Sequence, residues 1–202
     1  MQKINKVAPY RDFMRHILKN KPSRWDEIDG ALKLDMRLYM LAYEQDCLCG
    51  YSEIPLEAEN TSSHIDHFIK REYDNTKIFD WNNLITSAID EDFGGKYKDN
   101  TYKIQKLEYS QIFNPVIDDM TQFIEYSGDG SIIPQKDIDK INAGKVIKTI
   151  EVFNLNCASL KNRRKVLLES LQGCKDLPKD KVKQCFQSCG FISLINWFLK
   201  TF

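Results

Sequence analysis

The chain is 202 residues long and carries 29 lysines and arginines against 29 aspartates and glutamates, so its formal net charge is zero. This length suits one compact unit, or a small catalytic module with helical additions. The balanced charge argues against a free-standing nucleic-acid binder, which usually carries a basic excess because counterion release drives its affinity. If the chain acts on a polyanion, we expect a partner to supply much of the electrostatic attraction.

The sequence shows no sign of a membrane or secreted protein. No apolar run reaches the roughly 18 to 20 residues needed to span a bilayer, and the first residues lack the apolar segment of a secretory signal. The six cysteines form no evident disulfide framework, so we interpret them as reduced thiols in a cytoplasmic protein. Cys185 and Cys189, with Cys174 nearby, are expected to be small buried residues on a helix.

The N-terminal third is predicted to be helical. Apolar residues recur with a 3.6-residue period over residues 10–18, and Pro9 suits a first helical turn. A second helix is expected over about residues 25–45, after a polar break at residues 19–23. We expect these two helices to pack as a hairpin against the segment that follows.

Residues 47–99 form the segment best suited to chemistry. Residues 63–69 carry β-branched and aromatic residues between polar ones, which is typical of a strand, and residues 83–88 suit a second strand. The polar residues 70–80 would connect them. A short helix is predicted to begin over residues 90–98, with acidic residues in its first turn. Two strands and a helix make a compact frame that can hold one metal ion.

After residue 100 the pattern changes. Residues 121–134 predict a β-hairpin, with Gly128-Asp129-Gly130 at its turn. The apolar residues 191–199 must be either core or a contact for another chain. Helices are expected at about residues 137–151, 160–171 and 180–200.

Two of the three histidines of the chain lie close together, as His64 and His67, with Asp66 between them. A carboxylate directly before a histidine places an oxygen ligand for a hard metal ion beside a proton acceptor of near-neutral pKa. Asn83 follows in the second predicted strand, and Asp92 comes nine residues after it. A site that cuts phosphodiester bonds with one metal ion needs this order of groups.

The segment resembles the HNH, or ββα-metal, endonuclease superfamily, and most of the chain is similar to one branch of it. That branch is the PtuB type of HNH nuclease, from Septu and retron anti-phage systems. The motifs that carry the resemblance are, in chain order, Glu44-Gln45, Cys47-Leu48-Cys49-Gly50, His64-Ile65-Asp66-His67-Phe68, Phe79-Asp80-Trp81-Asn82-Asn83-Leu84, Gly94-Gly95-Lys96, Phe113-Asn114-Pro115, Gly128-Asp129-Gly130 and Thr149-Ile150-Glu151-Val152-Phe153-Asn154-Leu155.

The resemblance implies a role for the central residues of the motif. His67 matches the general base that activates the attacking water, and Asp66 matches the metal-binding carboxylate before it. Asn83 matches the middle asparagine, which tethers the loop that carries the base. Asp92 falls where the family has its last histidine or asparagine, a metal ligand.

Other positions are less firmly assigned by the resemblance. Lys96 matches a lysine that faces the phosphate or closes the helix, and His64 either acts directly at the site or is an ordinary strand residue. An aspartate at position 92 can bind Mg²⁺ but lowers the net charge of the site. Asp90 or Glu91 takes its place if the helix begins in another register.

Phosphodiester hydrolysis needs a positioned nucleophile, a base and a counter-charge for the developing anion. One Mg²⁺ or Mn²⁺ ion, held by two protein oxygens and several waters, can supply that counter-charge. Related nucleases often frame the module with a structural zinc held by two Cys-x-x-Cys pairs. Here the first pair is reduced to Cys47 and Cys49, and the second falls on Ala88 and Glu91, so we predict that the structural zinc is absent.

The predicted fold is α+β and mostly helical, in one compact unit. A small ββα-metal nuclease module (residues 47–100) would lie between an N-terminal helical hairpin (residues 1–46) and a helical C-terminal region with one additional β-hairpin (residues 101–202). The resemblance implies an endonuclease that cleaves DNA, with RNA possible because a metal-activated water needs no 2′-hydroxyl. It also implies that the nuclease is the effector of a bacterial anti-phage complex with an ABC- or SMC-like ATPase of the PtuA type.

Two alternatives come from other functional classes. Cys47, Cys49, His64 and His67 could ligate zinc in a non-catalytic interaction module, although a Cys-x-Cys spacing is tighter than usual for zinc. Alternatively, the chain is a decayed HNH scaffold that only recruits the ATPase. In that case His67→Ala would leave defence intact.

Overall fold

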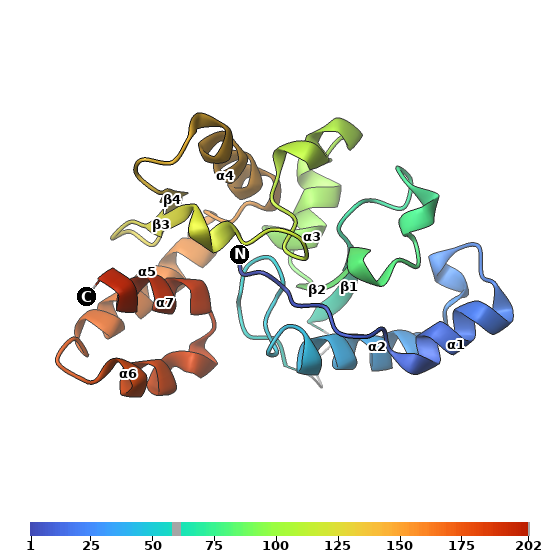
Figure 1. Ribbon diagram of the computed structural model, residues 1–202, viewed down its shortest axis with the longest axis horizontal. Helices are drawn as coiled ribbons and strands as arrows, with labels where there is room; N and C mark the ends of the chain where they lie inside the picture. Colours follow the sequence, from blue (N-terminus) through green and yellow to red (C-terminus); the bar gives the residue numbers. More distant parts are fainter. Residues whose placement is uncertain (58–61, 202) are drawn as a thin grey trace.

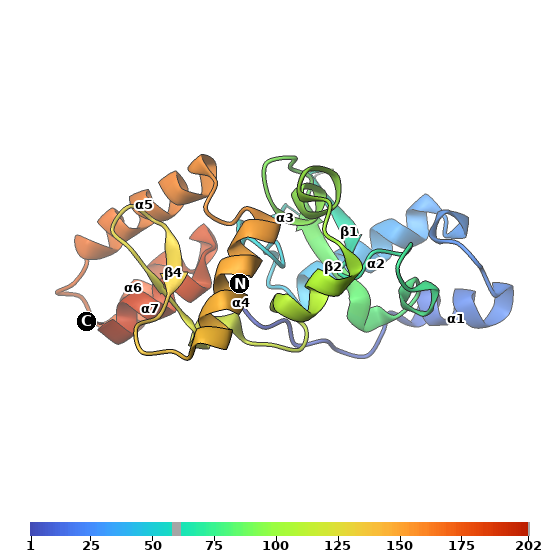
Figure 2. The same cartoon turned by 90° about the horizontal axis from the view of Figure 1, so that it is seen from above.

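The computed structural model describes residues 1–57 and 62–201 and confirms an α+β fold in which helices surround two antiparallel hairpins. Residues 58–61, within the predicted module of residues 47–100, and residue 202 lie outside the described residues. Helices α1 and α2 lie at one end of the elongated molecule and α5, α6 and α7 at the other (Figures 1 and 2). The first hairpin and helix α3 lie between the two ends.

The N-terminal helices are α1 (Arg11–Asn20) and α2 (Gly30–Tyr43). The predicted helix over residues 25–45 begins later than expected because Asp29 is extended and its carboxylate accepts the N–H of Leu32 at 2.9 Å, as a helix N-cap does. Before it, Trp25–Glu27 form a separate 3₁₀ turn. The expected packing of this pair against the next segment is confirmed by a buried cluster of Phe13, Met36, Met40, Trp81 and Leu84.

The central hairpin pairs β1 (Ser63–His67) with β2 (Leu84–Ala88), antiparallel, with His67 opposite Leu84. Both strands were predicted, and β1 ends two residues earlier than expected. Strand β2 is buried along its whole length. Gln45 bonds to the backbone of Thr86 with both its amide nitrogen and its amide oxygen, each at 2.8 Å. This side chain therefore pairs the outer edge of β2 as a neighbouring strand would.

Helix α3 (Gly94–Lys96) packs on β2 and continues into a π-helical turn, Tyr97–Tyr102. The predicted start near Asp90 is wrong. There the Asp90 carboxylate accepts the N–H of Asp92 at 2.8 Å in a local turn, and Phe93 is extended. The helix begins only at Gly94, whose φ of +75° is a conformation that favours glycine.

The second hairpin pairs β3 (Ile124–Tyr126) with β4 (Ile132–Pro134), as predicted. Its turn fits against α5 so closely that a Cβ on Gly130 would lie 2.1 Å from the carbonyl oxygen of Lys161. Gly130 also has φ +82°, so only glycine suits this position.

The remaining helices are α4 (Lys140–Phe153), α5 (Ala158–Gln172), α6 (Lys179–Phe186) and α7 (Ile192–Thr201). The single helix predicted for residues 180–200 is broken because Gly190 has φ +75°. Helix α7 packs on β3 and buries its apolar residues, so the apolar end of the chain is core.

All six cysteines are free. The expected burial of the C-terminal ones is wrong: Cys185 and Cys189 are exposed, and Cys174 is partly exposed. Cys185 lies on the short α6, which buries only Val182, and Cys189 lies in the 3₁₀ turn Gln187–Cys189 that follows it. Over the described residues, we find no helix with the length and apolar character needed to cross a membrane.

Candidate active site

A cavity of about 550 Å³ opens between the end of β1 and the helical segment that starts with α3, and we call it the hairpin cavity. It brings together four of the predicted site residues, namely His64, Asp66, His67 and Lys96. Asn83 and Asp92 do not line it. The residues of its lining that the sequence did not single out include Trp25, Lys70, Arg71, Glu72, Asp99 and Asn100.

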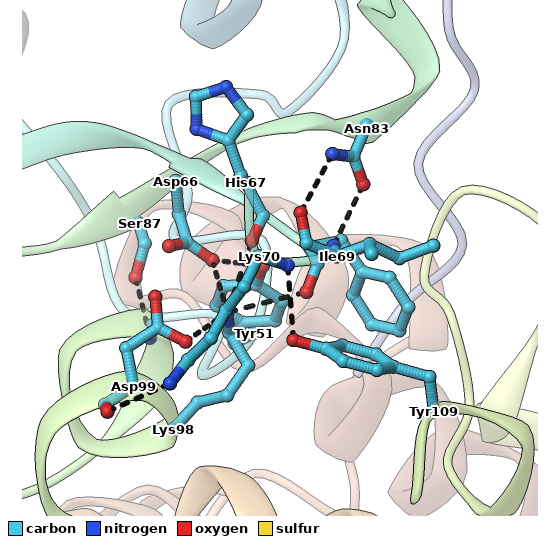
Figure 3. Close-up of polar contacts among 12 residues, drawn as sticks. Tyr51, Asp66, His67, Ile69, Lys70, Asn83, Ser87, Lys98, Asp99 and Tyr109 are labelled. Atoms are coloured by element: carbon cyan, nitrogen blue, oxygen red, sulfur yellow. Dashed lines mark hydrogen bonds and ion pairs between the residues drawn. The ribbon is translucent and has the colours of Figure 1, made fainter. Parts of the chain in front are cut away.

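Asp66 is buried at the base of the hairpin cavity. Its Oδ2 accepts a hydrogen bond of 2.6 Å from the hydroxyl of Tyr51 (Figure 3). Burial, followed by the charge of Asp66, raises the pKa of Tyr51 well above its usual value, so the phenol remains a donor. Tyr51 stacks on Phe153 of α4 at 4.3 Å, so the C-terminal region supports this contact.

Gly95 is the residue of α3 that approaches Asp66. A Cβ at position 95 would lie 2.6 Å from Cγ of Asp66, which is closer than real Cβ atoms approach any neighbour. The helix backbone is therefore pressed against the carboxylate. Within this turn, residues 95, 96, 99 and 100 line the hairpin cavity together.

His67 is buried and held as a defined tautomer. Its Nε2 lies 2.9 Å from the carbonyl oxygen of Ile78, and because a carbonyl can only accept, Nε2 carries the proton and Nδ1 is an acceptor. The ring of Trp25 meets the imidazole edge-on, with centroids 4.7 Å apart. Burial lowers the pKa of His67 to about 4, against the opposing effect of the Ile78 bond, so the imidazole is neutral at pH 7.

The two central groups point in different directions from the end of β1. Figure 3 shows the imidazole of His67 directed away from the carboxylate of Asp66. Both nevertheless line the hairpin cavity. A phosphodiester in this cavity can therefore lie between an oxygen ligand on one side and a proton acceptor on the other.

Asn83 ties together the loop between β1 and β2. Its amide nitrogen donates to the carbonyl oxygens of Ile69 and Lys77, both at 3.0 Å, and its oxygen accepts the N–H of Ile69 at 2.8 Å. Lys77 precedes Ile78, whose carbonyl orients His67. These contacts fit the tethering role that the resemblance implies.

His64 lies two residues before Asp66 on the same face of β1. Its Nδ1 is buried and has no hydrogen-bond partner within the described part of the chain. Burial lowers its pKa. Lys96 is partly exposed at the rim of the hairpin cavity and lies 3.7 Å from a carboxylate oxygen of Glu91.

Asp92 is placed outside the hairpin cavity. It is exposed, and its carbonyl oxygen accepts a hydrogen bond of 2.8 Å from Asn154 of α4. Asp90 and Glu91 do not line the cavity either. In α3 and the helical turn that continues it, Asp99 is the carboxylate that lines the hairpin cavity. It follows Gly95 by one helical turn. A prediction that began the helix at Gly94 would have placed Asp99 on the same face as Gly95, because residues i and i+4 of a helix are neighbours.

Lys98 links the carboxylates and is fully buried. Its ammonium lies 2.7 Å from Oδ1 of Asp99 and 3.4 Å from Oδ2 of Asp66, and it donates to the carbonyl oxygens of His67 and Phe68 at 3.1 and 3.3 Å. Burial and the charge of Asp66 raise the pKa of Asp99, while Lys98 opposes that shift. Sequence reasoning missed Lys98, which lies two residues from Lys96.

The donor set suits a small site for a hard cation. In the described part of the chain, no three His, Cys, Asp or Glu side chains lie close enough together to hold an ion by themselves. Mg²⁺ is commonly bound through only one or two carboxylates, with waters and substrate phosphates completing the shell. Asp66 and Asp99, which both line the hairpin cavity, are the residues that offer such oxygens.

The zinc alternative lacks a matching cluster among the described residues. The sulfur of Cys49 instead accepts the N–H of Ala88 at 3.4 Å, and Cys47 is exposed. Neither cysteine lines the hairpin cavity with His64 and His67.

Comparison with known proteins bears on the family of the chain. No protein-family model matches the chain. The chain is 26% identical to an Escherichia coli protein named "Retron Ec83 putative HNH endonuclease", over 86% of this chain and 81% of that protein. This similarity supports the HNH endonuclease family. It does not distinguish the PtuB branch within that family.

Proposed function

We propose that the chain is a metal-dependent HNH endonuclease that hydrolyses phosphodiester bonds of nucleic acid. The observation that carries the proposal is the pairing in one cavity of a neutral imidazole, whose Nδ1 is an acceptor, with the buried carboxylate of Asp66. General-base catalysis needs a group that is unprotonated at the working pH and fixed in direction. His67 meets both conditions.

Each of the main residues of the hairpin cavity has a separate role in the proposed reaction. Nδ1 of His67 accepts a proton from the attacking water, while the bond from Nε2 to Ile78 keeps the ring in place. Held by Asp66 and Asp99, a Mg²⁺ or Mn²⁺ ion would supply positive charge for the developing phosphorane and the leaving oxygen. Lys96 at the rim adds positive charge toward the phosphate.

The biological setting is part of the same proposal. We place the chain in the PtuB branch, as the nuclease effector of a bacterial anti-phage complex with an ABC- or SMC-like ATPase of the PtuA type. The name of the E. coli relative refers to a retron, which supports such a setting. The net charge of zero supports dependence on a partner for binding a polyanion. DNA is the favoured substrate, and RNA is compatible with the mechanism. The free cysteines fit a reducing compartment such as the bacterial cytoplasm.

A second candidate is a decayed HNH scaffold that only recruits the ATPase. The observation that favours it is the ammonium of Lys98, which already pairs with Asp66 and Asp99. A cation site that is neutralised by the protein itself binds a metal ion less strongly. The two candidates differ in whether His67 is needed for activity.

The deciding experiment is nicking of supercoiled plasmid by the purified chain, with and without the neighbouring ATPase, in Mg²⁺, Mn²⁺ or EDTA. We expect metal-dependent nicking that His67→Ala abolishes. The matched control is His16→Ala, because His16 is a partly exposed histidine of α1 outside the hairpin cavity. If plasmid is not cut, the same variants are assayed on RNA. Equal activity of wild type and His67→Ala, or no cleavage of either substrate, would favour the scaffold.

A further inference from the structure

A second cavity, of about 390 Å³, adjoins the hairpin cavity. The two share the side chains of Trp25, His64 and Ile65 as a common wall. We call this second cavity the flanking pocket. Its other main lining residues are Lys33, Leu34, Arg37 and Ile89.

The two cavities differ in charge. The described lining of the flanking pocket contains Lys33 and Arg37 and no acidic residue. Arg37 is held in place by its hydrogen bond to Oγ of Ser63 at 2.7 Å. The hairpin cavity, by contrast, balances its cations with carboxylates: Lys70, Arg71 and Lys96 against Asp66, Glu72 and Asp99. In the described lining of the flanking pocket, Lys33 is the cation that lies against the ring of Trp25.

The flanking pocket is also apolar. Leu34 and Ile89 are each 47% exposed, and they line the pocket together with Ile65 and the partly exposed ring of Trp25. The ammonium of Lys33 lies 5.5 Å from the centre of the Trp25 ring. The ammonium lies over the ring face, so a base that stacks on Trp25 takes its place there and the displaced ammonium pairs with the phosphate of the same nucleotide.

We propose that the flanking pocket binds an unpaired nucleotide next to the cleaved phosphodiester, so that the protein acts on single-stranded or locally unpaired nucleic acid. This inference rests on the proposed nuclease function. In a duplex, each base is stacked between its neighbours and paired across the helix, so it cannot lie against Trp25 without being extruded at a cost of a few kcal/mol. A strand without pairing meets no such cost.

The test measures binding separately from cleavage, with full-length His67→Ala protein in Mg²⁺. Fluorescein-labelled 12-nucleotide single strands of mixed sequence, as DNA and as RNA, are compared with the blunt DNA duplex of the same sequence by fluorescence anisotropy. We expect single strands to bind at least about tenfold more tightly than the duplex. Adding Trp25→Ala should weaken single-strand binding about tenfold or more, which is the scale of one lost stacking contact.

Three further variants control for folding and specificity. Trp25→Phe keeps an aromatic ring and should retain most of the affinity, and Lys33→Ala should weaken binding and reduce its salt dependence. Tyr43→Ala removes an exposed aromatic ring from the same helix as Lys33 but outside the pocket, and should bind as the parent does. Circular dichroism confirms that each variant is folded.

The outcomes separate this inference from the proposed function. Equal or tighter binding of the duplex, unchanged binding by folded Trp25→Ala, or no binding of any strand up to about 100 µM, the weak end of non-specific affinity, overturns the inference. Plasmid nicking that depends on His67 still supports the nuclease in each of these cases. Conversely, Trp25-dependent binding of single strands without cleavage by wild type leaves the pocket assigned and the nuclease rejected.

Discussion

The ammonium of Lys98 lies 3.4 Å from Oδ2 of Asp66, and both side chains are buried. The same ammonium bonds to the carbonyl oxygens of His67 and Phe68, where β1 ends. One buried cation thus fixes the carboxylate and the backbone of the base together. The Asp66 carboxylate and the backbone of His67 are therefore held in a fixed relative position at the end of β1.

Lys98→Met should be strongly destabilising. It leaves Asp66 and Asp99 without their buried counter-charge, and breaking a buried pair from one side costs roughly 3 to 5 kcal/mol. Urea unfolding of wild type and variant measures the loss. The double variant Lys98→Met with Asp99→Leu should recover part of it, since one unpaired carboxylate is removed. A loss below about 1 kcal/mol in the single variant would contradict this account of the site.

Asn83→Ala should destabilise the protein and reduce cleavage. Three hydrogen bonds between the side chain and the loop backbone are lost, and each buried group left unsatisfied costs about 1 to 3 kcal/mol. Because the loop carries Ile78, whose carbonyl orients His67, kcat should fall even at temperatures where the variant is folded. Asn82→Ala, at the exposed neighbouring position, should change neither quantity. Full activity of folded Asn83→Ala would reject the tethering role.

The sequence predicted the hairpins well because their signals are local. β-Branched and aromatic residues between polar ones mark β1, and a glycine-rich turn marks the second hairpin. It failed where backbone conformation decides the outcome. Acidic residues at 90–92 look like the first turn of a helix, yet Asp90 closes a turn instead. Gly190, at φ +75°, breaks a helix that looks continuous by its apolar period.

The sequence identified the strand residues of the site and Lys96, but missed the groups that surround Asp66. His64, Asp66 and His67 are neighbours in sequence, so the motif places them together. Tyr51 and Lys98 contact the Asp66 carboxylate from distant parts of the sequence, and Lys98 also binds Asp99, which only the packing shows. The resemblance placed the last ligand at Asp92, which lies outside the hairpin cavity.

Gly95→Ala should reduce cleavage by tenfold or more. The added Cβ would lie 2.6 Å from Cγ of Asp66, so either the carboxylate or the helix must move. Displacements of about 1 Å at a reacting centre can cost a hundredfold in rate. Gly144→Ala is the matched control, because nothing lies within 4 Å of a Cβ there and the helical position gains about 0.5 to 1 kcal/mol of stability. Plasmid nicking and thermal unfolding of both variants separate a site effect from a folding effect.

Acidification should destabilise the wild type through His67. Its folded-state pKa of about 4 lies below the roughly 6.5 of a free histidine, so the unfolded chain binds more protons between these values. The corresponding stability is fully present above about pH 6.5 and is lost as the pH falls toward 4. The total is at most roughly 3 kcal/mol. Urea unfolding from pH 7 to 4 measures it against His67→Gln, which does not titrate. Parallel pH profiles for the two proteins would show that the imidazole is not buried as a neutral group.

Asp99, rather than Asp92, should be the second carboxylate on which cleavage depends. Asp99 faces the hairpin cavity beside Asp66, whereas Asp92 is exposed and bonds through its backbone to Asn154. Asp99→Asn keeps the size of the side chain and removes its charge, so it should raise the Mg²⁺ concentration needed for half-maximal nicking about tenfold or more, because a charged oxygen ligand is lost. Asp92→Asn should leave the Mg²⁺ titration unchanged, since its side chain lies outside the cavity. The reverse pattern would place the cation on the sequence-predicted ligand and imply that α3 begins earlier when substrate is bound.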